Sequence, residues 1–104
     1  MKISPLKFEE NSENKSIVVF LPVRVDSAVS TEIEDNISEI LKDKEGYDIT
    51  FDATDMEYTS SAGLRIVMAT KKRYPSLKIV NAREEVYEIF DVTGFTTMME
   101  IAKN

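Results

Sequence analysis

The sequence predicts an α/β fold in which a mixed central sheet of four or five strands contains parallel strands joined by helical crossovers. Short runs of β-branched and apolar residues alternate with longer segments of helical periodicity. The order of these segments is strand, helix, strand, helix, strand, which is typical of parallel strands joined by right-handed crossovers. Proline or glycine stands at several of the boundaries between them.

The first strand is predicted in the apolar run "SIVVFLPV" at residues 16–23, which is short enough to be a strand buried on both faces. Pro22 is expected to end it. The preceding "PLKFEE" at residues 5–10 can pair with this run as a hairpin across the polar turn of residues 11–15.

The first helix is predicted within residues 26–46, where apolar residues recur at helical spacing and would form one buried face. These residues are Val29, Ile33, Ile37, Ile40 and Leu41. Most acidic residues of the segment fall on the opposite, solvated side. Asp26 or Ser27 is expected to cap the helix, and Gly46 follows its end.

A second strand is predicted at residues 47–53, and a second helix at residues 61–74. The stripe that should face the sheet consists of Leu64, Val67 and Met68. Cationic residues in the last turn suit the helix dipole, and Pro75 stops the helix.

The last part of the chain repeats this pattern. A third strand is predicted at residues 77–80. A short helix is predicted within residues 83–94, with Gly94 just past its end. Its buried face consists of Val86, Ile89 and Phe90. An apolar piece at residues 97–101 is predicted as an edge strand.

Length and composition restrict the class of protein. A chain of 104 residues has room for one modest core, so residues 1–104 are expected to form a single domain. The net charge of −6, without a dense Lys/Arg tract, argues against nucleic acid as a partner. The chain contains no apolar run near the roughly 18 residues of a membrane helix. The absence of cysteine is what a cytoplasmic protein would show.

The missing residue types exclude several kinds of chemistry. Without His or Cys, the chain cannot form a Ser-His-Asp triad, a Cys nucleophile or a zinc site of the usual ligands. Gly46, Gly63 and Gly94 are too far apart for a glycine-rich phosphate loop. We therefore predict no catalytic residue, metal ligand or cofactor site.

The stretch "YTSSAGLR" at residues 58–65 is the main candidate for a site. It places hydroxyls at the start of the second helix, on the sheet edge where ligands and partners gather, and the loop with Asp26 shares this edge. Either Ser60 or Ser61 can cap the helix. Gly63 in the first turn costs about 1 kcal/mol relative to Ala. Its presence indicates close approach by another backbone.

Three motifs also occur in the order found in one known family. Residues 51–65, "FDATDMEYTSSAGLR", are similar to a strand followed by a "D(S/T)(S/T)GL" or "SSAGLR" loop. Residues 23–37 are similar to "GxLDxxxxxxLxxxL", with Asp26 retained, and residues 86–95 to "VxxxLxxxGL". Over about residues 16–97 the chain thus resembles the STAS domain family of bacterial anti-sigma factor antagonists. The resemblance implies a STAS-like fold.

The resemblance also implies a role for these residues. In regulatory members of the family, an anti-sigma factor with serine kinase activity phosphorylates the hydroxyl residue two positions before the Gly, and a serine phosphatase removes the phosphate. Counted back from Gly63, this residue is Ser61. The unmodified protein would bind the kinase and so release a sigma factor. The partner-binding residues expected from this role are Asp26, Thr59, Ser60, Ser61, Ala62, Gly63 and Arg65.

The physical chemistry of phosphoserine suits such a switch. It adds a charge of about −1.5 to −2, which the amino end of a helix tolerates and which Arg65, one turn later, can pair with. A partner surface shaped for a neutral serine would instead meet this charge beside Asp26.

Other readings of the same residues stay open. The chain can be a STAS module that scaffolds a larger assembly or binds a nucleotide, with Ser61 unmodified. It can also be a small enzyme that uses Asp26, Asp52 or Asp55 together with Ser61, although no general base is evident in the sequence. Each site residue also has a purely structural role open to it, as a helix cap or a solvated helix residue.

Overall fold

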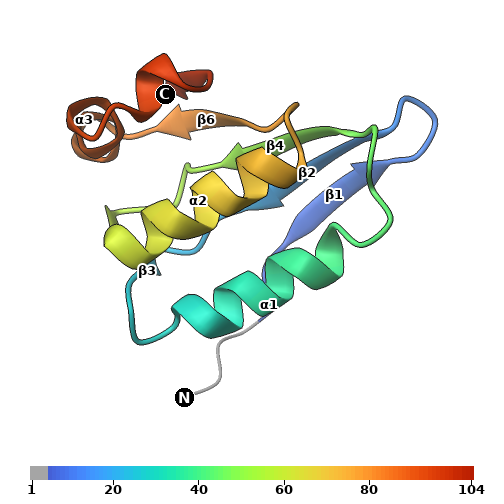
Figure 1. The fold of residues 1–104 in the computed structure, drawn as a ribbon, viewed down its shortest axis with the longest axis horizontal. Coiled ribbons are helices and arrows are strands. Elements are labelled where there is room, and N and C mark those ends of the chain that lie inside the picture. The colour runs from blue at the N-terminus through green and yellow to red at the C-terminus, as the bar shows by residue number, and fades with distance from the viewer. Residues whose placement is uncertain (1–4) are drawn as a thin grey trace.

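The computed structural model describes residues 5–104, which form a five-stranded sheet, a two-stranded sheet and three α-helices (Figure 1). The large sheet contains β1 (Phe8–Asn11), β2 (Ser16–Phe20), β4 (Asp48–Asp52), β6 (Lys78–Ala82) and β7 (Ile101–Lys103). The small sheet contains β3 (Arg24–Val25) and β5 (Tyr58–Thr59). The helices are α1 (Ser30–Ile40), α2 (Ser61–Arg73) and α3 (Glu84–Val92), followed by the 3-10 turn η1 (Phe95–Thr97).

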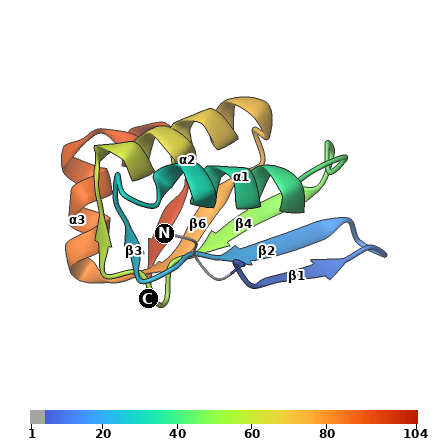
Figure 2. The same cartoon turned by 90° about the horizontal axis from the view of Figure 1, so that it is seen from below.

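The strand order in the large sheet is β1-β2-β4-β6-β7. The strands β1 and β2 form the predicted antiparallel hairpin, and every other neighbouring pair is parallel. After the hairpin the chain advances by one strand at a time, with one helix before each new strand. Right-handed crossovers in a single direction place helices on one face, and Figure 2 shows α1 and α2 on the same side of the sheet. The predicted fold class is confirmed.

The side chains of the central strands alternate between a buried and a half-buried face. The side chains on the face that the helices cover are at most 1% exposed. They belong to Ile17, Val19, Ile49, Phe51 and Ile79. Between them, Val18, Thr50 and Val80 are half-buried. The prediction that residues 16–23 are buried on both faces is therefore wrong, because the helices cover one face of the sheet. The run also ends as a strand at Phe20 rather than at Pro22.

The edge strand predicted at residues 97–101 lies elsewhere. Gly94, with φ +85°, ends α3, and the chain then turns through η1. Phe95 packs against Phe90 in the core, with ring centroids 5.7 Å apart. The edge strand is β7, whose first residue pairs with Ile79 of β6. The position of β7 depends on its pairing with β6. The apolar residues before it, which suggested a strand at residues 97–101, belong partly to η1 and its end.

The predicted capping of α1 is wrong. The helix begins at Ser30 without a side-chain cap. The Asp26 carboxylate accepts a hydrogen bond from the Ala28 N–H at 3.1 Å, which makes a turn before the helix. Gly46, with φ +88°, lies well beyond Ile40, in the loop before β4.

The predicted stripe of α2 is partly correct. Val67 is 6% exposed, but Leu64 and Met68 are only half-buried. The prediction missed Ile66, which is 5% exposed because α1 covers that side of the helix. The buried face of α2 is therefore turned toward α1 as well as toward the sheet.

Candidate functional site

Two loops from the carboxyl ends of β2 and β4 meet at one edge of the large sheet. The small sheet joins them, because Arg24 and Val25 of β3 pair in parallel with Tyr58 and Thr59 of β5. The Ser60 N–H also donates to the Val25 carbonyl at 2.8 Å. The sequence predicted that the loops share an edge, but it gave no sign of this sheet, since strands of two residues have no detectable periodicity.

Ser60 is the N-cap of α2. Its backbone is extended, with φ −94° and ψ 179°, and its Oγ accepts a hydrogen bond from the Ala62 N–H at 3.2 Å. Its carbonyl accepts the Leu64 N–H at 3.1 Å. Ser60 therefore satisfies one of the N–H groups that the start of a helix leaves without a partner.

Ser61 is the first residue inside α2, and it is exposed. Its hydroxyl forms no hydrogen bond with any residue in the range 5–104. The sequence left open which of the two serines caps the helix. In the structure Ser60 is the cap, and the hydroxyl of Ser61 is free to react or to contact another molecule.

Gly63 is in the first turn of α2 because the helix packs very closely on the small sheet. A Cβ atom at this position would lie 2.1 Å from Thr59 Oγ1 and 2.8 Å from Val25 Cγ1. Real Cβ atoms essentially never come so close to other atoms. The close approach is made by the protein's own β3 and β5. The nearest atoms belong to side chains, and the expected backbone contact is that of the Val25 carbonyl at 3.1 Å.

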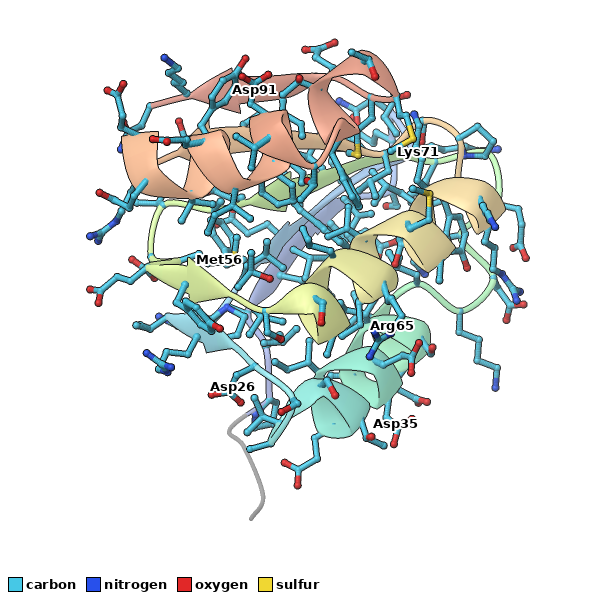
Figure 3. The ribbon with its side chains drawn as sticks, turned by 60° about the vertical axis from the view of Figure 1, so that its left-hand side comes forward. Asp26, Asp35, Met56, Arg65, Lys71 and Asp91 are labelled. Atoms are coloured by element: carbon cyan, nitrogen blue, oxygen red, sulfur yellow. The ribbon has the colours of Figure 1, made fainter. Side chains whose placement is uncertain are left out.

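Asp26 lies where the chain leaves β3 for α1 (Figure 3). Its carboxylate Oδ2 is 3.5 Å from the Nε of Arg24. The guanidinium of Arg24 also lies over the ring of Tyr58, at 4.7 Å from its centroid. These contacts hold Asp26 beside the small sheet, next to Val25, whose carbonyl accepts the Ser60 N–H.

Arg65 lies one turn after Ser61, on the side of α2 that borders α1 (Figure 3). The other arginines, Arg24, Arg73 and Arg83, each pair with a carboxylate. Arg65 is exposed and has no carboxylate partner in the described part of the chain. Helical side chains lean toward the amino end, so the guanidinium can reach an anion on Ser61.

The loop from β4 to β5 is fastened to β6 and to the start of α3. Asp52 accepts hydrogen bonds from the N–H and hydroxyl of Thr54, at 2.8 and 2.5 Å, and from the Asn81 side chain at 3.0 Å. Burial raises the pKa of Asp52, but these hydrogen bonds outweigh burial and hold the pKa below its ordinary value. Arg83 donates to the Thr54 carbonyl at 3.3 Å and pairs with Glu57 at 3.8 Å.

The arrangement presents a hydroxyl without activating it. A general base must come within hydrogen-bond reach of the proton it removes, and none of Asp26, Asp52 and Asp55 bonds to Ser61 in the structure of residues 5–104. The same range holds no group of three or more acidic residues placed to bind a metal ion. No helix within it is long and apolar enough to cross a membrane.

Comparison with known proteins decides the family. The sequence model of the STAS domain family matches residues 7–104, nearly the whole chain. The chain belongs to the STAS domain family. No functionally curated protein matches the sequence significantly.

Solved structures of anti-sigma factor antagonists share the fold of this STAS domain. The antagonist from Mycobacterium paratuberculosis has a TM-score of 0.81 at 19% identity, over 95% of this chain and 85% of that chain. The STAS domain protein from Planctomyces limnophilus has a TM-score of 0.81 at 11% identity, over 95% and 90%. The Bacillus cell fate determinant SpoIIAA in its phosphorylated form has 0.64 at 15% identity, over 95% and 92%. The predicted STAS-like fold is confirmed.

The structure brings the predicted site residues together, with different accessibility. Ser61 and Arg65 are exposed, and Asp26 and Ser60 are half-buried. The interior positions are Thr59, Ala62 and Gly63. These three can shape the site, but they offer little surface to a partner. The sequence did not predict Arg24 and Tyr58 as part of the site, because only the small sheet brings these two residues together.

Proposed function

We propose that this STAS domain is a phosphorylation-controlled protein-binding module that acts as an anti-sigma factor antagonist in the cytoplasm. The unmodified chain binds an anti-sigma factor that is also a serine kinase, which releases a sigma factor and so regulates transcription. The kinase phosphorylates Ser61, and a serine phosphatase removes the phosphate. The chain is a substrate and a binding partner in this cycle, and it performs no catalysis of its own.

The observation that carries the proposal is the different environment of the two adjacent serines. Ser60 caps α2 through its side chain, so its hydroxyl contributes to the stability of the helix. The exposed Ser61 hydroxyl bonds to nothing else in residues 5–104. A phosphoryl group on Ser61 therefore removes no internal hydrogen bond.

The charges around Ser61 favour a switch in binding rather than in folding. A phosphate on the first residue of α2 lies at the positive end of the helix dipole, and Arg65 is available to pair with it. The fold thus tolerates the new charge. A partner surface in contact with a neutral serine would have to accommodate a dianion next to Asp26, and the complex would be lost.

The structural neighbours support the same reading. Several of them are anti-sigma factor antagonists by name, and one of these, SpoIIAA, was solved both in an unphosphorylated and in a phosphorylated form. A shared fold that exists in both states is what a phosphorylation switch at this loop requires.

No observation favours the alternative of nucleotide binding or of scaffolding. The groove between α1 and α2 has a volume of about 230 Å³ and is lined partly by the buried Ile37, Leu41 and Ile66. Small-molecule sites usually have volumes of about 300 to 1,000 Å³. Both this groove and the open hollow of about 290 Å³ beside Tyr47 and Ser76 are smaller than that.

The experiment compares Ser61→Ala, Ser61→Asp and Ser60→Ala in binding to a purified anti-sigma factor serine kinase, with intact-mass measurement after incubation with ATP. Ser61→Ala should bind as tightly as wild type and take up no phosphoryl group. Ser61→Asp should fold normally and lose affinity by roughly 30- to 5,000-fold, equivalent to about 2 to 5 kcal/mol.

Stability measurements on the same variants separate the switch from the cap. Ser60→Ala should lower the free energy of unfolding by about 1 kcal/mol, whereas Ser61→Ala should change it by less than about 0.5 kcal/mol. A Ser61→Asp protein that binds the kinase as tightly as wild type would refute the proposed switch.

A further inference from the structure

Two exposed apolar residues lie at the start of the small sheet, because Val23 directly precedes β3 and Tyr58 is the first residue of β5. Val23 is 46% exposed and Tyr58 is 38% exposed. The Val23 carbonyl accepts hydrogen bonds from the N–H groups of Glu57 and Tyr58, at 2.8 and 3.2 Å, so the backbone keeps the pair together. Large apolar residues that remain this accessible, on neighbouring segments of backbone, are candidates for contact with another protein.

Arg24 extends this pair into a patch with a charge. Its guanidinium stacks on the Tyr58 ring and contacts Asp26 through Nε, while its side chain remains 61% exposed. A guanidinium has five N–H donors, so one carboxylate does not saturate it. We call Val23, Arg24 and Tyr58 together the ribbon patch.

The ribbon patch is continuous with the site of the proposed function. Arg24 contacts Asp26, and the backbone of Ser60 bonds to Val25 at the end of β3. A partner that covers Ser61 and Asp26 therefore borders the patch directly. Tyrosine and arginine are also the residue types most often found, with tryptophan, at the energetic centres of protein interfaces.

We propose that the ribbon patch anchors the partner and helps to select it. Tyr58 and Val23 enter an apolar pocket of the partner, and Arg24 pairs with a carboxylate on the rim of that pocket. The inference rests on the proposed function, because the occupant is the same anti-sigma factor that contacts Ser61. It adds the chemistry of the partner surface: an apolar pocket with an acidic rim.

The test measures the dissociation constant of a purified anti-sigma factor serine kinase for Tyr58→Ala, Tyr58→Phe and the control Phe8→Ala. Phe8 is a suitable control because it is 47% exposed but lies on β1, an edge strand of the five-stranded sheet, whereas Tyr58 belongs to the separate two-stranded sheet. Tyr58→Ala should weaken binding by roughly 10- to 100-fold. Tyr58→Phe, which keeps the ring, and Phe8→Ala should stay within about threefold of wild type.

The charge is tested by Arg24→Gln and Arg24→Glu. Arg24→Glu should weaken binding more than Arg24→Gln, and the difference should shrink at high salt, because it arises from charge repulsion at the rim. Melting temperatures of all variants close to that of wild type would show that the losses come from the interface.

The outcomes distinguish the inference from the function on which it rests. A kinase that binds wild type and Tyr58→Ala equally well would overturn the ribbon patch and leave the Ser61 switch intact. Weak binding by Tyr58→Ala together with full binding by Ser61→Asp would support the patch and overturn the switch. Failure of such kinases to bind even the wild-type chain would overturn both.

Discussion

The two loops at the carboxyl edge of the sheet are held in different ways. The β4–β5 loop, residues 53–57, is fastened to β6 through Asp52 and to the start of α3 through Arg83, and it leads to a helix with a side-chain cap. In the loop that contains β3, residues 21–29, the side chain of Asp26 bonds only within the same loop, and α1 begins without a side-chain cap.

This difference indicates which loop supports the other. The backbone around β3 bonds to the end of the β4–β5 loop, to β5 and to the N-cap of α2. The carbonyls of Val23 and Val25 accept these bonds from the N–H groups of residues 57, 58 and 60. The start of α2 therefore packs on both strands of the small sheet, whereas the side chain of Asp26 contacts only its own loop. A change at the start of α2 should disturb both loops, whereas a change at Asp26 should stay local.

The largest effect is expected from Gly63→Ala. Alanine is a better helix former than glycine by about 1 kcal/mol, but its Cβ would overlap Thr59 and Val25. Overpacking of this kind typically costs about 1 to 3 kcal/mol. Urea unfolding should therefore show a lower free energy of unfolding for Gly63→Ala than for wild type.

Two matched variants identify the cause. Ala69 is exposed on the same helix, so Ala69→Gly should cost only the propensity difference of about 1 kcal/mol. In a Thr59→Ala background, which removes the nearest atom, Gly63→Ala should cost less than in the wild type. If Gly63→Ala instead stabilises the protein, the close packing of α2 on the small sheet is not what requires the glycine.

A smaller effect, dependent on pH, is expected from Asp52. Its pKa is lowered in the folded state, so its hydrogen bonds contribute stability that is fully present above the unfolded pKa of about 3.9 and is lost as the pH falls through the folded pKa. The contribution should be about 1 kcal/mol, the net value of a hydrogen bond. Wild type should therefore exceed Asp52→Asn in stability at pH 6, and the gap should close below about pH 4.

The control for this titration is Asp55→Asn, in the same loop and exposed. At pH 6 its free energy of unfolding should stay within about 0.5 kcal/mol of the wild-type value. A gap between wild type and Asp52→Asn that stays constant from pH 6 to pH 3 would show that the carboxylate charge does not fasten the β4–β5 loop.

The parts of the fold that periodicity describes could be predicted from the sequence. The hairpin, the parallel strands and the three helices each follow from apolar spacing over several residues. The cap of α1 could not, because Asp26 has the residue type of a cap but uses its carboxylate in a turn before the helix. The buried side of α2 depends on where α1 packs, which no pattern within α2 reports.

Only the part of the candidate site that consists of consecutive residues could be predicted from the sequence. The motif around Gly63 located Ser60 and Ser61, but it left open which of them caps the helix. Arg24 and Tyr58 were missed because their contact crosses from one loop to the other through strands of two residues. Side-chain contacts between loops depend on tertiary structure, and a single sequence carries no signal for them.

The smallest effect on stability is expected from Asp26→Asn. The amide oxygen of asparagine can still accept the Ala28 N–H and keep the turn. Only the exposed ion pair with Arg24 is lost, which is worth at most about 1 kcal/mol. Under the proposed function, however, kinase affinity should fall clearly, because Asp26 belongs to the surface beside Ser61. The matched control is Asp35→Asn, an exposed acid on α1 (Figure 3), which should change neither quantity. A lowered melting temperature with unchanged affinity would mean that Asp26 serves the fold. The loop that contains β3 would then contribute more to the stability of the protein than its contacts indicate.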